Sequence, residues 1–211
     1  MLGADFAPEV VTVPEAKAGT PAAASWTVTN RYAPLDGKLV GGPLGSSETS
    51  RPTIKQGDTA TSTVEVPAGA ESLDVAIGGV SDPSADLDLT VYGEDGAVVA
   101  QSADGDSQES VSLAKPAAGT YTVEVVGYSV PSGSTEYDYR DVYFADTLGS
   151  VTVDGSAPVK LGTGDSATVS GSVTALAAAP EGREFFGRVQ LVNAHDTVAG
   201  LGSVRIGKVV P

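Results

Sequence analysis

Residues 85–128 read ADLDLTVYGEDGAVVAQSADGDSQESVSLAKPAAGTYTVEVVGY, and apolar and polar side chains alternate through most of this stretch. Alternation with a period of two is the pattern of a strand that turns one face to the core and the other to water. It predicts strands at residues 86–92, 97–101, 109–115 and 120–128, joined by Gly-, Pro- and Asp-rich turns. The stretch therefore indicates antiparallel β-structure.

The same alternation continues on both sides of this stretch. We expect further strands at residues 24–30, 62–67, 72–78, 149–155, 165–176, 183–193 and 203–210. Short strands separated by turn-forming residues, with 26 Gly and 13 Pro in the chain, favour an all-β fold of antiparallel β-sandwiches. Residues 33–58 are rich in Gly, Pro and Ser, and we interpret them as a connector. Residues 173–182 are interpreted as the end of a strand followed by a loop.

Charge marks a separate module in the middle of the chain. Between Gln56 and Ala114 there are twelve Asp and Glu residues and no Lys or Arg, and the whole chain has a formal charge of −15. A surface of this sign repels nucleic acid, which is not expected as a partner. The absence of Cys excludes disulfides and thiolate metal sites. No membrane span is expected, and Met1 is followed by no signal-peptide pattern, so an exported parent would contain this chain as a fragment.

The quoted motif resembles the bacterial pre-peptidase C-terminal (PPC) domain, and the likeness extends over about residues 51–144. The flanks resemble the fibronectin-III-like region that follows the catalytic domain of secreted subtilisin-like (S8) serine proteases, through TVTN (27–30), GSVTVDG (149–155) and FFGRVQLVN (185–193). Together the resemblances imply a jelly-roll-like PPC sandwich of residues 51–146. It would interrupt a discontinuous fibronectin-III-like sandwich made of residues 1–50 and 147–211.

The resemblance also implies a role. The chain would be a non-catalytic accessory region of an exported protease, which stabilises the parent or binds a protein substrate or a surface. Its partners would be the parent's catalytic domain and a protein or polysaccharide substrate. A carbohydrate- or matrix-binding module and a purely structural spacer are the alternatives. The single histidine, His195, lies in the turn NAHDTVAG and is interpreted as a solvated turn residue rather than a catalytic base.

Carboxylates gather at two loops of the predicted PPC module. Calcium binds six to eight oxygen ligands, and neighbouring loops can supply them. If residues 87–92 and 97–101 form a hairpin, the two loops lie at the same end of the sandwich. The candidate Ca²⁺ ligands are Asp82, Asp86, Asp88, Asp104, Asp106 and Glu109. The alternative is a solvated acidic edge that opposes strand association.

Three tyrosines occupy alternate positions in STEYDYRDVYF (134–144): Tyr137, Tyr139 and Tyr143. On an exposed strand face they would offer rings for stacking on sugars or extended peptide. The alternative is that they cover the seam between the two modules. Trp26, Phe185 and Phe186 are expected in the core of the fibronectin-like module.

Overall fold

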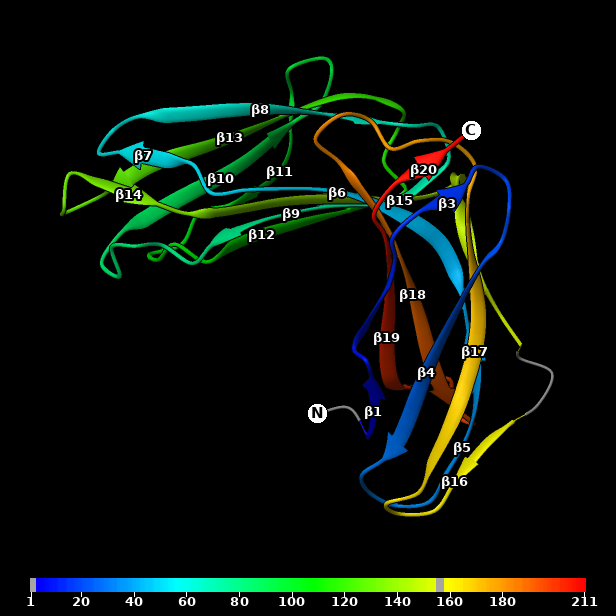
Figure 1. Ribbon diagram of the computed structural model, residues 1–211. Coiled ribbons are helices and arrows are strands. Elements are labelled where there is room, and N and C mark those ends of the chain that lie inside the picture. Colours follow the sequence, from blue (N-terminus) through cyan, green and yellow to red (C-terminus); the bar gives the residue numbers. More distant parts are fainter. Residues whose placement is uncertain (1–2, 155–157) are drawn as a thin grey trace. The chain divides into compact units, whose positions relative to one another are not determined.

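The computed structural model describes residues 3–154 and 158–211, and every regular element in these residues is a β-strand (Figure 1). The predicted all-β class is confirmed. Within the described residues no helix is long and apolar enough to cross a membrane. The strand predicted at residues 149–155 is present as far as Val153, and its last residue, Gly155, lies outside the described residues.

The chain divides into two compact units. Unit 1 consists of Met1–Ser46 and Asp146–Pro211, and unit 2 of Ser47–Ala145. Strands β6 (Gly42–Ser50) and β15 (Asp138–Val153) each run from one unit into the other. The sequence places the corresponding joints after residues 50 and 146.

Unit 1 contains β1 (Ala4–Ala7), β2 (Val10–Val13), β3 (Ala16–Lys17), β4 (Ala22–Asn30), β5 (Leu35–Val40), β16 (Val159–Leu161), β17 (Ser166–Ala175), β18 (Glu184–Asn193), β19 (Val198–Ile206) and β20 (Val209–Val210). The strand order is β1-β4-β17-β15-β6-β18-β19-β2, and β5 pairs with both β18 and β16. Most pairs are antiparallel, whereas β2 runs parallel to β19 and β3 parallel to β20.

The core of unit 1 centres on Trp26 of β4, which is buried. Its ring meets Phe6 edge-on with 6.5 Å between centroids, and its Nε1–H donates to the carbonyl of Ser203 at 3.2 Å. Phe185 is also buried, as expected, whereas Phe186 lies at an intermediate position beneath the guanidinium of Arg188. The alternating apolar residues of β4, β17 and β18 thus pack against one another.

Unit 2 contains β7 (Thr53–Lys55), β8 (Thr59–Val66), β9 (Ala70–Gly78), β10 (Asp86–Tyr92), β11 (Val98–Ser102), β12 (Glu109–Ala114), β13 (Gly119–Ser129) and β14 (Ser134–Glu136). One sheet has the order β11-β10-β13-β8, and the facing layer is formed by β12, β9 and the first half of β15 (Figure 1). Leu87, Leu89 and Val91 of β10 are fully buried between the layers. This is the side of the strand that the alternation assigns to the core.

The expected connector at residues 33–58 is instead largely extended, with β5, β6 and β7 lying inside it. Several of its glycines and serines are core residues, namely Gly37, Gly45, Ser46 and Ser47. Ser46 is fully buried, and its hydroxyl accepts a hydrogen bond from Nε of Arg183 at 2.7 Å. Small side chains permit close strand packing here, and their composition imitates that of a linker.

Candidate functional site

The hairpin expected from the sequence brings two acidic loops to one end of unit 2. Strands β10 and β11 pair antiparallel, and the turn between them is closed by a hydrogen bond from the Gly93 amide to the Ala97 carbonyl at 2.9 Å. The loop after β11 then returns to the start of β10, where the Leu87 amide donates to the carbonyl of Asp106 at 3.1 Å. Residues 86–88 and 104–106 are therefore neighbours.

Glu109 is the innermost carboxylate at this end. It opens β12 opposite Ile77 and is only 1% exposed. The Ser102 hydroxyl donates to one carboxylate oxygen, and the Asp104 amide donates to the other at 3.0 Å. These neutral donors leave its negative charge uncompensated by any described basic side chain.

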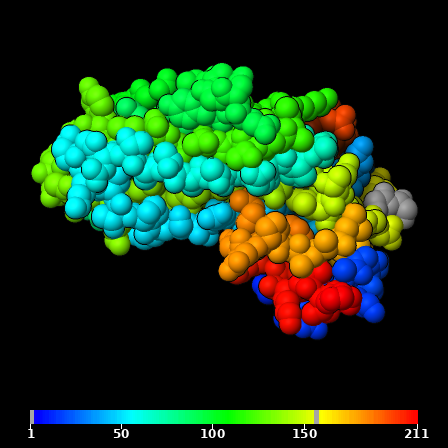
Figure 2. Space-filling model, turned by 90° about the horizontal axis from the view of Figure 1, so that it is seen from above, coloured from blue at the N-terminus to red at the C-terminus, as the bar shows by residue number. Residues whose placement is uncertain are grey.

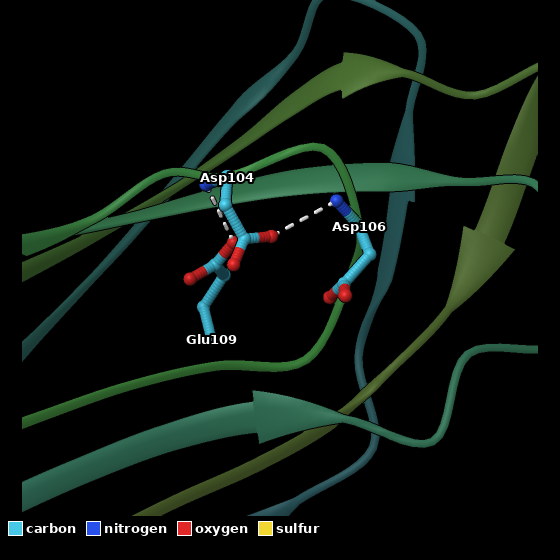
Figure 3. Close-up of side chains that lie close together, drawn as sticks. All are labelled: Asp104, Asp106 and Glu109. Atoms are coloured by element: carbon cyan, nitrogen blue, oxygen red, sulfur yellow. Dashed lines mark hydrogen bonds between the residues drawn. The ribbon is translucent and has the colours of Figure 1, made fainter.

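Asp104 and Asp106 lie on the loop that covers Glu109 (Figure 3). The Asp106 amide donates to Oδ1 of Asp104 at 3.1 Å, and the Gln108 amide donates to Oδ1 of Asp106 at 2.6 Å. One oxygen from each of Asp104, Asp106 and Glu109 lies within 4.8 Å of the others. Oxygens on opposite sides of a Ca²⁺ ion are about 4.6–5.2 Å apart, so this spacing fits a calcium coordination shell.

Asp86 and Asp88 lie beside this group. Burial raises the pKa of Asp88, and the negative charges of Asp86 and Glu109 raise this pKa further. Oδ1 of Asp86 is buried, and no described residue donates a hydrogen bond to it. Both observations indicate a surplus of negative charge that a bound cation would relieve.

Asp82 has a different role from the other five candidates. Its Oδ1 accepts a hydrogen bond from the Ser84 amide and its Oδ2 one from the Ser132 amide, both at 3.0 Å. The hydrogen bond from Ser132 is the main reason that the pKa of Asp82 is lowered, and the bond from Ser84 adds to it. The side chain thus joins two turns, and its oxygens are already engaged.

The three tyrosines do not form an exposed face. Tyr137, Tyr139 and Tyr143 are 2%, 6% and 3% exposed, so their rings cannot stack on a sugar or a peptide. The Tyr139 hydroxyl donates to Oδ2 of Asp141 at 3.0 Å and accepts from Ser62 at 3.2 Å. Burial raises the pKa of Tyr139, and the charge of Asp141 adds to this effect. Alternation correctly indicated a shared side but not that this side is buried.

His195 lies in an exposed turn, where its backbone amide donates to Oδ1 of Asn193 at 2.9 Å. The same oxygen accepts from the Thr197 amide at 3.0 Å, and Asp196 has a φ of 56°. These contacts belong to the turn that joins β18 and β19. The surroundings of His195 are those of a solvated turn residue.

The module in the middle of the chain is similar in sequence to a known family. Residues 58–127 match the family described as the bacterial pre-peptidase C-terminal domain. This segment is a PPC domain. The match covers β8 and extends into β13, and thus includes the hairpin and the acidic loops. It confirms the resemblance found in residues 85–128.

A longer relative extends the similarity beyond the PPC domain. The chain is 31% identical over 153 residues to Pyrolysin of Pyrococcus furiosus, an alignment that covers 71% of this chain and 11% of Pyrolysin. The chain therefore spans about a tenth of that protein's length. An alignment of this length exceeds unit 2, residues 47–145, so it includes part of unit 1.

Similar solved structures include the pre-peptidase C-terminal domain of a Bacillus anthracis collagenase, with 18% identity and a TM-score of 0.31. That likeness covers 43% of this chain and 84% of the other. Tripeptidyl peptidase 2 is similar with 9% identity and a TM-score of 0.47, over 96% of this chain and 19% of that one.

Sequence reasoning did not single out Ser102 or Asp141, although both shape the buried polar groups of the PPC unit. Ser102 donates to Glu109, and Asp141 is 1% exposed beside Tyr139. The only available signal for Asp141 was its position two residues from Tyr139 and from Tyr143, which places all three on one side of a strand. From the sequence alone, a carboxylate at such a position is expected to face solvent, because the strand that covers it is distant in sequence.

Proposed function

We propose that the chain is a non-catalytic accessory region of an exported subtilisin-like serine protease, which stabilises the parent enzyme or holds a protein substrate or surface close to it. The observation that carries this proposal is the alignment with Pyrolysin, which is longer than the PPC unit and so includes residues of both units. A similar stretch that includes part of each unit therefore occurs in a larger protein. The proposal includes secretion of the parent, which PPC domains of this kind favour.

Unit 1 takes the place of the fibronectin-III-like module in this proposal. Support comes from its discontinuity, because residues 1–46 and 146–211 form one compact unit around the inserted PPC unit. The motifs TVTN and FFGRVQLVN lie on β4 and β18, which are both core strands of unit 1. Carbohydrate or matrix binding would need a surface other than the three buried tyrosines.

Thermal inactivation of the parent enzyme tests the stabilising role. We expect the enzyme that lacks these 211 residues to lose activity faster on heating than the intact enzyme. A second arm incubates the isolated chain with an insoluble protein substrate, which should retain it if the chain binds substrate. Both forms of the accessory role would be contradicted if the two enzymes were inactivated at equal rates and the isolated chain did not bind to the insoluble substrate.

We also propose that the acidic end of the PPC unit binds Ca²⁺, with Asp104, Asp106 and Glu109 as ligands and Asp86 and Asp88 adjacent. The buried charge of Glu109 and the unpartnered Oδ1 of Asp86 support this proposal, together with the 4.8 Å spacing of the three ligand oxygens. A hard cation prefers carboxylate oxygens of this kind. The ion would tie the loop after β11 to the start of β12.

A melting experiment tests calcium binding. A ligand that binds only the folded chain stabilises it by about 2.7 kcal/mol at a hundredfold excess over Kd, so Ca²⁺ should raise the Tm and a chelator should lower it. Glu109→Gln keeps the shape of the side chain and should abolish the shift. Glu65→Gln on β8 is the matched control and should keep it. An equal shift in wild type and Glu109→Gln would rule out this site.

A further inference from the structure

The outer face of the β11-β10-β13-β8 sheet carries the carboxylates of Asp88 and Glu124, and only Asp88 adjoins the proposed calcium site. Unit 2 has seventeen Asp and Glu residues against four Lys and Arg, a net charge of −13 out of −15 for the chain. Figure 2 is viewed from above this face, and the cyan to green surface of unit 2 is closely packed and without a deep hollow. This face therefore belongs to a strongly acidic unit, and no deep hollow interrupts the side seen in Figure 2.

Strand register places three functional groups next to one another on this face. Tyr92 lies opposite Thr122, Thr90 opposite Glu124, and Asp88 opposite Val126. Glu124 is therefore a diagonal neighbour of both Tyr92 and Asp88, a separation of about 7–8 Å between Cα atoms. The inward residues Leu89, Val91, Val123 and Val125 are buried, which fixes the outward direction of this group.

Contacts within the group orient Glu124. The Tyr92 hydroxyl donates to Oε1 of Glu124 at 3.1 Å, and no described residue donates to the second carboxylate oxygen. In the described part of the chain, no ion pair involves Glu124 or Asp88. Val98, directly across from Tyr92 on the edge strand, is 56% exposed. The face therefore combines an aromatic ring, two carboxylates without ion pairs and an exposed aliphatic side chain.

We propose that this face binds an arginine side chain presented by an extended segment of a protein partner. A guanidinium stacks on an aromatic ring and forms paired hydrogen bonds with a carboxylate, which matches Tyr92 beside Glu124. Asp88 supplies a second negative charge on the other side of Glu124. Val98 contacts an apolar residue of the same segment. The like charge of two copies of unit 2 opposes a second copy of this chain as the occupant.

This inference rests on the proposed accessory role, because it names the class of protein segment that the region would hold. The two can nevertheless fail separately. Peptide binding is measured on the isolated 211-residue chain, whereas thermal inactivation is measured on the parent enzyme. A failure to bind the peptide would leave the expected thermal inactivation unchanged, and the reverse also holds.

The test uses an acetylated and amidated peptide, Thr-Val-Thr-Arg-Thr-Val-Thr, and follows its binding by NMR titration of the chain. We expect saturable binding with shifts centred on β10 and β13. Replacing the arginine by citrulline keeps its shape but removes its charge and should weaken binding about tenfold, as expected for a lost charge-assisted contact. The titration is run in calcium and in chelator, because Asp88 also adjoins the proposed metal site.

Two matched variants separate a specific site from general attraction. Glu124→Gln retains an acceptor for Tyr92 and should weaken binding about tenfold, whereas Glu71→Gln, an exposed residue of β9, should change it less than about twofold. Melting curves confirm that both variants are folded. Equal weakening by the two variants, no saturable binding, equal binding of the citrulline peptide, or sedimentation showing dimers of the chain through this face would overturn the proposal.

Discussion

Single residues decide how the loops of this protein are joined, and Asn30 is the clearest case. It is buried at the end of the TVTN motif, and its Nδ2 donates to the carbonyls of Ala33 at 2.9 Å, Gly162 at 3.1 Å and Leu161 at 3.2 Å. One amide group thus connects the turn after β4 to the turn before β17. This explains why an amide, with two donors, ends the motif.

Replacing Asn30 by Asp should destabilise unit 1 by at least about 1–3 kcal/mol, because carbonyls lose their donor and face a carboxylate. Urea unfolding measures the change. The matched control is Thr29→Ala, one residue earlier, which removes only an exposed hydrogen bond to Ser166 and should cost less than about 0.5 kcal/mol. Equal effects of the two variants would show that the Asn30 contacts contribute nothing specific.

The acidic end of the PPC unit makes a pH-dependent prediction. The pKa of Asp88 is raised in the folded chain, so folding favours the protonated carboxyl group. The ionised carboxylate therefore destabilises the folded state above that pKa, and this effect disappears as the pH falls through it. In chelator at neutral pH, Asp88→Asn should therefore raise the Tm by about 1–2 °C. The gain should shrink toward acid pH, and differential scanning calorimetry across pH would measure it. A gain independent of pH would contradict the electrostatic explanation.

At the scale of elements, side-chain alternation located most strands of the PPC unit. Residues 86–92 are predicted and observed as one strand, because its fully buried leucines alternate with half-buried aspartates. Alternation fails where small residues fill the core. In β6, Gly45, Ser46 and Ser47 are buried, and nothing in their hydrophobicity distinguishes them from a loop.

The candidate site was predictable only in part. The loops that carry Asp86 and Asp104 follow from the hairpin, so their proximity could be predicted from local sequence. The burial of Glu109 depends on its pairing with β9, whose residues are distant in sequence. The same limit applies to Tyr139. Alternation assigns its side chain to one side of the strand but does not predict whether another sheet packs on that side.

Gly187 in the FFGRVQLVN motif illustrates packing between strands. A Cβ at this position would overlap Cγ2 of Val151 and would lie 3.2 Å from Cδ2 of Leu44. Gly187→Ala should therefore cost about 1–3 kcal/mol by overpacking, measured by urea unfolding. Gly42→Ala in β6 is the control, because a Cβ there meets no atom within 4 Å. A Gly187→Ala chain as stable as the control would show that the core adapts to the added methyl group.

At the scale of the whole molecule, the PPC unit is an insertion between two strands that are neighbours in the strand order. Strands β6 and β15 adjoin, so removing residues 47–145 leaves two ends that belong to neighbouring strands. A short Gly-Ser linker between Ser46 and Asp146 should leave unit 1 folded. Circular dichroism should then show a cooperative β-sheet transition, whereas an unfolded product would mean that the two units are not separable.

The central claim is that this region acts on the parent's substrate or stability and not on the bond that is cut. The most direct measurement is the ratio of kcat/KM for a large protein substrate to kcat/KM for a short chromogenic peptide, in the intact parent and in the parent without these 211 residues. The account predicts unchanged peptide hydrolysis at a temperature where both enzymes are stable, with a lower ratio in the shortened enzyme if the region holds substrate. Loss of peptide hydrolysis in a shortened enzyme that remains folded would contradict it.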